Sequence, residues 1–330
     1  MEVGNEQAGA PKKPSLARQV APWLFAAGIL AFMLYKVDFR KVGEALAGAR
    51  ASWIVAAFLT YCAVYYLTDV LSFYRSYNWF NVEISLGETA RLRFASYTVQ
   101  AVNGALTEIM SVLYMFRVKK TPVLEVSSSA GFVYFNETVT LVALLSFCAF
   151  LLPEQNRIRA SVPWIGVQYW SVFQGLIILA WAVVPLWLAF WRTGLRDRWP
   201  RWRDASVLTA FKQATIANYG EVFLYRFSNN LISVVANIVM LKALGIAAPA
   251  ALMFAAVPVM VNVAYWPVSA GGFGGPQLVA HFLLKGYATE EQVLAYSLIW
   301  SALFFLTRVF SGLPLLAPVY RAAFPARREA

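Results

Sequence analysis

The segment Trp266–Gln277 reads WPVSAGGFGGPQ and interrupts a long apolar region. Pro267 and Pro276 lack a backbone N–H and end helices, whereas glycine leaves backbone amides uncovered. A helix that restarts near Pro276 would offer free N–H groups and a positive dipole end, which bind anions such as phosphate. The alternative is a tight helix crossing, which small residues also permit. We predict a binding loop whose contributing residues are Ser269, Gly271, Gly272, Gly274, Gly275 and Gln277.

A second interruption, QAVNGALTEIM, spans residues 100–110. Asn103 and Gly104 could unwind a helix at this point, and Glu108 would bring an acid to it. We include these three residues in the predicted substrate site. The alternative is an ordinary helix whose polar residues face the helix bundle.

Six ionisable residues lie in or near apolar segments, and a charge inside a bilayer costs at least about 2.5–3.5 kcal/mol. They are Asp69, Glu108, Glu137, Glu221, Arg226 and Arg308. We place Asp69 and Glu221 near the membrane surface, in structural roles. Among the remaining four residues we predict an ion pair, either Glu137–Arg308 or Glu108–Arg226. In one hypothesis the arginines neutralise a lipid phosphate, with Glu137 as partner or proton-coupling site. A permanent salt bridge is the alternative.

The amino-acid composition indicates whether these ionisable residues belong to a soluble protein or to a membrane protein. The chain has 330 residues, of which 60% are hydrophobic and 14% charged, and soluble domains average about 25% charged residues. Apolar segments of nearly the ~20 residues that span a bilayer recur along the chain. We therefore predict an all-α polytopic membrane protein. The net charge of +11 is typical of basic cytoplasmic loops and does not require nucleic acid.

Residues 20–320 are predicted to form one transmembrane domain between tails at 1–19 and 321–330. The full spans are expected at Val20–Tyr35, Trp53–Phe73, Val126–Leu152, Tyr169–Trp191, Gly220–Leu241 and Gln292–Val319. Two further segments, Phe94–Phe116 and Ala250–Leu284, contain the interruptions and are predicted to be re-entrant.

Basic residues set the predicted orientation. If both interrupted segments enter and leave on one side, most of the 28 Lys and Arg residues fall in cytoplasmic loops, Arg93 among them, and both termini are cytoplasmic. The halves 20–152 and 169–320 then have the same order of segments and opposite orientation. Inverted repeats with broken helices at matching places are typical of secondary transporters.

The sequence contains few of the residue patterns that are typical of catalytic sites. His281 is the only histidine, so no His or Cys cluster predicts a metal site, and no phosphate loop or nucleophile elbow is present. We expect no enzymatic activity and no cofactor.

Residues 244–316 resemble the carboxy-terminal signature of the flippase-like family named for the lysylphosphatidylglycerol synthetase transmembrane region. The resemblance rests mainly on PVSAGGFG at 267–274, with DFRKVGEALAGARASW and YFNETVTL as weaker features. The chain departs from the family at four positions. Pro276 and Gln277 replace a basic and an acidic residue, Ser111 replaces a base, and Ser301 replaces an arginine, although Arg308 lies two turns further on.

The resemblance implies movement of a phospholipid, hopanoid-type lipid or lipid-linked anionic headgroup between leaflets, in the bacterial inner membrane. The soluble synthase domain of the bifunctional relatives is missing from the sequence. A non-catalytic scaffold or accessory subunit of a lipid- or glycan-synthesis enzyme is the alternative, with that enzyme as its partner. A membrane-embedded transferase would require a carboxylate cluster near one leaflet, which the sequence does not reveal.

Overall fold

The computed structural model describes residues 40, 43–44, 47–102, 106–154, 170–264, 269 and 273–323. These residues are predominantly helical, with an isolated β-bridge between Lys285 and Ala288. The prediction of an all-α polytopic membrane protein is confirmed. Helices long and apolar enough to cross a membrane are α3 (Ala51–Phe80), α6 (Val123–Leu151), α8 (Trp170–Arg192), α11 (Ile216–Ala243) and α14 (Glu290–Ala323). The predicted span Val20–Tyr35 lies outside the described residues.

Each of the two interrupted segments forms a pair of short helices. The first pair is α4 (Leu86–Val102) and α5 (Leu106–Val118), and the second is α12 (Ala250–Val263) and α13 (Gly275–Leu284). The members of each pair pack against each other. The longest of the four, α4, has 17 residues and is about 26 Å long at 1.5 Å per residue. The hydrocarbon layer is about 30 Å thick, so each of these four helices is shorter than that layer. That the two segments are re-entrant stays a prediction.

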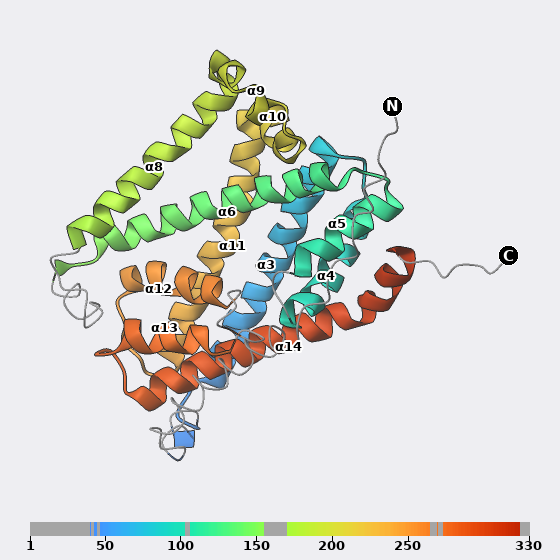
Figure 1. The fold of residues 1–330 in the computed structure, drawn as a ribbon. Helices are drawn as coiled ribbons and strands as arrows, with labels where there is room; N and C mark the ends of the chain where they lie inside the picture. Colours follow the sequence, from blue (N-terminus) through green and yellow to red (C-terminus); the bar gives the residue numbers. More distant parts are fainter. Residues whose placement is uncertain are drawn as a thin grey trace, which may run out of the picture.

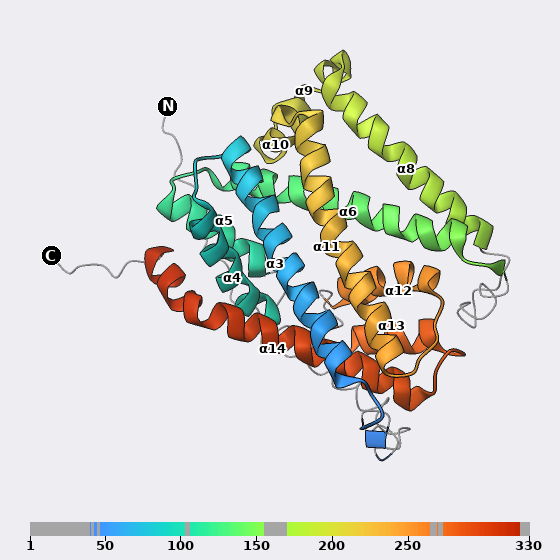
Figure 2. The ribbon, with the colours of Figure 1, turned by 180° about the vertical axis from the view of Figure 1, so that it is seen from behind.

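Helices α3 and α11 lie side by side and antiparallel through the centre of the molecule (Figures 1 and 2). Helix α14 runs along one side, with the α4–α5 pair packed near one end and α13 near the other. Helix α6 crosses α3 and α11 and contacts both, while α8 extends outward from α6 (Figure 1). Between α8 and α11 the chain forms η2 (Gly194–Arg198), α9 (Pro200–Arg203), η3 (Ser206–Leu208) and α10 (Thr209–Gln213).

Side-chain caps fix where two important helices begin. At the start of α11 the Thr215 hydroxyl accepts a hydrogen bond from the backbone N–H of Asn218 at 3.2 Å. The side-chain oxygen of Asn218 accepts one from the backbone N–H of Thr215 at 2.7 Å. Ser85 accepts from the amide of Glu88 at 3.1 Å before α4. Such caps satisfy N–H groups that have no intrahelical partner.

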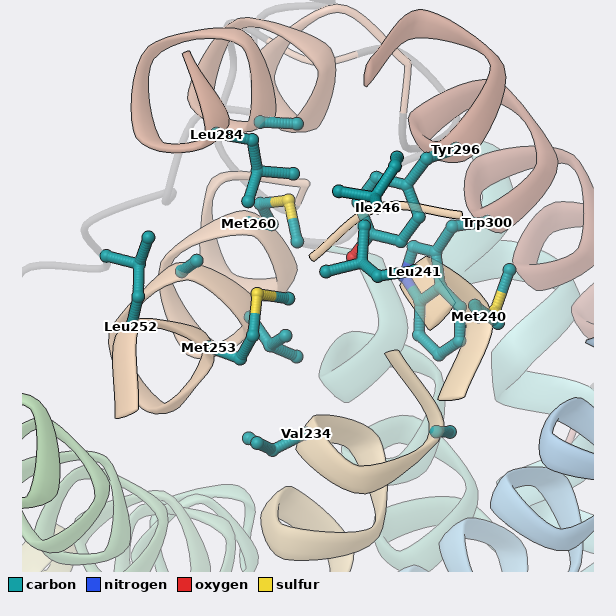
Figure 3. Close-up of a cluster of buried hydrophobic side chains, with 14 of the residues drawn as sticks. Val234, Met240, Leu241, Ile246, Leu252, Met253, Met260, Leu284, Tyr296 and Trp300 are labelled. Carbon is teal, nitrogen blue, oxygen red and sulfur yellow. The ribbon is translucent and has the colours of Figure 1, made fainter. Parts of the chain in front are cut away.

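The apolar residues form two separate clusters. The first lies among α11, α12, α13 and α14, with residues of α3 and α6, and includes Met240, Met253, Met260, Tyr296 and Trp300 (Figure 3). The second joins α3, α4, α5, α6, α10 and α11 with the ends of α8 and α14. It includes Phe73, Tyr77, Phe132, Trp191 and Phe211. Because α3, α6 and α11 contribute to both clusters, each of them has a stretch between the clusters where other residue types are buried.

Helices α14 and α4 approach most closely at Gly312. A Cβ atom at this position would lie 2.1 Å from the carbonyl oxygen of Phe94 and 2.3 Å from the Thr98 hydroxyl. A backbone oxygen cannot move aside without shifting the helix, so this contact requires glycine.

We predict that Gly312→Ala lowers the thermal unfolding midpoint of the purified protein in detergent, because overpacking costs about 1–3 kcal/mol. Gly220→Ala in α11 is the matched control, since no atom lies within 4 Å of its added Cβ and alanine favours helix. A Gly312→Ala midpoint equal to or above that of the wild type would contradict this packing.

Candidate functional site

A belt of buried polar residues separates the two apolar clusters on the three central helices. On α3 the belt contains Thr68 and Asp69. On α6 it contains Asn136 and Thr140 beside the partly buried Glu137, and on α11 it contains Arg226, Asn229, Asn230 and Ser233. Burying polar groups between two cores is costly unless they bind each other or a ligand. The belt is therefore the part of the molecule where a function is to be sought.

Asp69 is the centre of the belt and is only 2% exposed. One oxygen accepts from Nε of Arg93 at 2.9 Å, and the other accepts from Nη1 of Arg226 at 2.8 Å. The Tyr97 hydroxyl donates to the same carboxylate. The Arg93 guanidinium also lies 3.7 Å from the centre of the Phe73 ring. A single carboxylate thus joins α3, α4 and α11.

Two glutamates extend this arrangement on either side. Glu108 of α5 accepts from Nη1 of Arg93 at 2.9 Å and from the Tyr134 hydroxyl. Glu137 of α6 lies 3.7 Å from Nε of Arg226 and accepts from the Asn230 amide at 2.8 Å. The contacts run in space from Glu108 through Arg93, Asp69 and Arg226 to Glu137, so that acids and bases alternate. We call these five residues the charge chain. Its five residues come from five different helices.

The charge chain lines a cavity of about 360 Å³. The other lining residues are mostly polar or aromatic, among them Tyr61, Tyr65, Gln100, Asn229, Ser233 and Asn262. At ~30 Å³ per water molecule, the cavity has room for about a dozen waters or one polar headgroup.

Several buried polar atoms of the cavity have no hydrogen-bond partner within the described part of the chain. They are Nε and Nη2 of Arg226, one oxygen each of Glu108 and Glu137, and the Gln100 and Ser233 oxygens. An unsatisfied buried donor or acceptor costs about 1–3 kcal/mol, and more when it is charged. A molecule bound beside them would satisfy both donors and acceptors.

The structure corrects two predictions about charged residues. Asp69 does not lie at the surface of the protein, because it is buried at the centre of the charge chain. The predicted Glu137–Arg308 and Glu108–Arg226 pairs are wrong, since Glu137 pairs with Arg226 and Glu108 with Arg93. Arg308 lies 3.5 Å from the Phe304 ring and donates to the Tyr65 hydroxyl at 3.4 Å. Arg308 lines a separate small pocket beside Cys62 and Tyr66.

Arg93 is the functional candidate that sequence reasoning missed, because it was assigned to a cytoplasmic loop. It is 2% exposed and lies two turns inside α4. The sequence SLGE at residues 85–88 has the Ser-x-x-Glu pattern of a helix N-terminus, and the Ser85–Glu88 contact forms. This signal could have placed Arg93 within the bundle. Glu221, for which a structural role was predicted, forms a partly exposed ion pair to Arg75 at 2.8 Å.

Four residues of the two predicted binding loops, Asn103, Gly104, Gly271 and Gly272, lie outside the described residues. The described part of the glycine loop is occupied by internal contacts. The Ser269 hydroxyl donates to the Val263 carbonyl at 2.8 Å. Gly275 packs so closely that an added Cβ would lie 2.3 Å from the Ser269 hydroxyl.

The backbone N–H of Gly274, where φ is 95°, has a hydrogen-bond partner within the protein. It donates to the Gln277 side chain at 2.7 Å. The Gln277 amide in turn donates to the Ser301 hydroxyl at 2.9 Å and ties α13 to α14. Ser269, Gly274, Gly275 and Gln277 do not line the cavity of the charge chain. Their role in binding a substrate stays a prediction.

The helices and the buried charges together define a polytopic α-helical membrane protein with a polar cavity inside its bundle. The profile of the family described as the lysylphosphatidylglycerol synthase TM region matches residues 19–312, so this chain belongs to that family. No match was found among curated proteins.

We predict that Asp69→Asn strongly lowers the thermal unfolding midpoint, because breaking a buried ion pair costs about 3–5 kcal/mol and leaves two guanidiniums facing each other. Glu221→Gln is the control, since the Glu221–Arg75 pair is partly exposed and such pairs contribute about 0–1 kcal/mol. Equal midpoints for the two variants would show that the charge chain does not stabilise the bundle.

Proposed function

We propose that this protein is a lipid translocator, which moves a phospholipid, hopanoid-type or lipid-linked anionic headgroup between membrane leaflets. The observation that carries the proposal is the polar cavity of the charge chain, which lies between two apolar clusters. A lipid headgroup must cross an apolar layer, and a polar cavity halfway along the helices lowers the cost of that crossing. Membership of the family supports a role in lipid metabolism or translocation.

The order and packing of the helices support an inverted repeat. A long helix, a pair of short helices and a second long helix occur in this order as α3, α4–α5, α6 and as α11, α12–α13, α14. The contacts between the halves also correspond, because α4 packs on α14 and α12 packs on α6. We propose that the two short pairs are re-entrant and that the halves rock against each other across the cavity.

The chemistry of the cavity favours binding over reaction. Each carboxylate of the charge chain accepts a hydrogen bond from a guanidinium, a hydroxyl or an amide, and this arrangement suits the binding of a charged group. We propose no catalytic step and no cofactor for this chain. If the purified protein moved no lipid while remaining folded, the scaffold or accessory-subunit function would be preferred.

We predict that Arg226→Gln reduces lipid movement at least about tenfold, the effect of losing about 1.4 kcal/mol of headgroup binding. The assay reconstitutes the protein into liposomes with tagged phosphatidylglycerol and measures leaflet-selective extraction. Arg203→Gln is the control, since Arg203 lies outside the cavity in α9. Wild-type rates in Arg226→Gln would exclude the cavity as the headgroup path.

We further propose that the chain lies in the bacterial inner membrane with both termini in the cytoplasm. The connection at residues 192–203, which carries five arginines, is then cytoplasmic. A Thr193→Cys variant lacking Cys62 and Cys148 should react with an impermeant maleimide in inverted vesicles and not in spheroplasts. The opposite labelling pattern would reverse the orientation.

A further inference from the structure

The charge chain has more acids than bases. Glu108, Asp69 and Glu137 alternate with only two guanidiniums, those of Arg93 and Arg226. With every group ionised the formal charge is −1, and uncompensated buried charge is costly. An anionic headgroup would add to this negative charge. A single proton on one carboxylate makes the empty chain neutral.

Glu137 is the acid whose charge is compensated least. Asp69 has two guanidiniums within 2.9 Å and a tyrosine hydroxyl, and Glu108 has one guanidinium at 2.9 Å and a tyrosine hydroxyl. The nearest guanidinium nitrogen to Glu137 is 3.7 Å away, beyond hydrogen-bond distance, and its closest donor is the neutral Asn230 amide. A neutral carboxyl is therefore best tolerated at Glu137.

The helices packed against α6 place few charges near Glu137. Helix α11 contributes Arg226, α3 contributes Asp69, and α5 contributes Glu108 on the far side of the cavity. The 14 residues of α12 include no charged side chain. Arg192 of α8 is bound to the Ala214 carbonyl, and Lys212 belongs to α10 beside the second apolar cluster. Arg226 is thus the cation on which the charge of Glu137 depends.

The guanidinium of Arg226 has one side that is hydrogen-bonded and one side that is not hydrogen-bonded within the described part of the chain. Nη1 donates to Asp69 at 2.8 Å, whereas Nε and Nη2 have no hydrogen-bond partner among the described residues. Nε and Nη2 are the adjacent donors that bind two oxygens of a phosphate in a bidentate manner. The ionised Glu137 carboxylate competes for this side, and a protonated one does not.

We propose that Glu137 takes up a proton when an anionic lipid headgroup binds to Nε and Nη2 of Arg226. The inference rests on the proposed function and adds to it a coupling ion, because the proton and the headgroup then favour each other's binding. This coupling is reciprocal. Headgroup affinity rises as the pH falls, until Glu137 is already protonated in the empty protein, and it falls as the pH rises.

The test is calorimetric titration of the full-length purified protein with dioctanoyl phosphatidylglycerol, in buffers of different ionisation enthalpy between pH 5 and 8. We expect uptake of up to about one proton per lipid bound and a decrease in affinity of up to about tenfold per pH unit. Glu137→Gln should bind without proton uptake and with an affinity independent of pH. Glu221→Gln, altered outside the cavity, should behave like the wild type.

Several outcomes would overturn the inference. They are wild-type binding without proton uptake, uptake that survives in Glu137→Gln, absence of lipid binding, and preferential binding of a cationic lipid that strengthens with rising pH. The wild-type measurement decides the matter even if Glu137→Gln fails to fold. Glycerol phosphate is titrated separately, and tighter binding of this soluble anion than of the lipid would assign the cavity to soluble phosphates and likewise overturn the inference.

Transport separates this inference from the function on which it rests. In liposomes held at equal pH on both sides, we expect lipid movement to change with pH in the wild type and not in Glu137→Gln. Movement at the same rate at every pH would support the translocator function and contradict proton coupling. Absence of lipid movement under every condition would contradict both the translocator function and proton coupling.

Discussion

The structure depends on a buried carboxylate shared by two guanidiniums. Asp69 holds Arg93 and Arg226 at hydrogen-bond distance, and the three side chains come from helices α3, α4 and α11. In an apolar environment none of these charges is stable alone, so the helices must be positioned together. The antiparallel α3–α11 pair thereby acquires a fixed register at its centre. The two outer glutamates then attach α5 and α6 to the same point.

Around this centre, the two halves of the chain are interleaved. Helix α4 packs on α14 through the close approach at Gly312, and α12 packs on α6. At the other end of α14, Gln277 and Ser301 form a neutral hydrogen bond at 2.9 Å. These are positions where the family resemblance leads one to expect an acid and an arginine. A neutral pair holds α13 to α14 here, which leaves the buried charges concentrated in the central cavity.

The sequence was sufficient to predict the fold class, the interruption of two apolar segments, each of which forms two short helices, and three members of the charge chain, Glu108, Glu137 and Arg226. It was misleading for Asp69 and Arg93. Both lie close to polar sequence, which resembles a membrane boundary, yet α3 continues to Phe80 and α4 begins at Leu86. Both helices therefore carry these residues further inside than hydropathy indicates. Hydropathy averages over a window and does not detect an isolated buried ion pair.

The amino-acid sequence by itself determined that the chain is a bundle of apolar helices with a few costly charges, because burial of apolar side chains and backbone hydrogen bonding act locally along the chain. Only the tertiary structure decided which charges meet. Asp69 and Arg226 are separated by 157 positions in the sequence, and Glu137 and Arg226 by 89. Ion pairing depends on distance in space, and packing of the two apolar clusters sets that distance. The tertiary structure also determined that the described part of the glycine loop is closed by its own contacts, because Gln277 caps the helix that follows the loop.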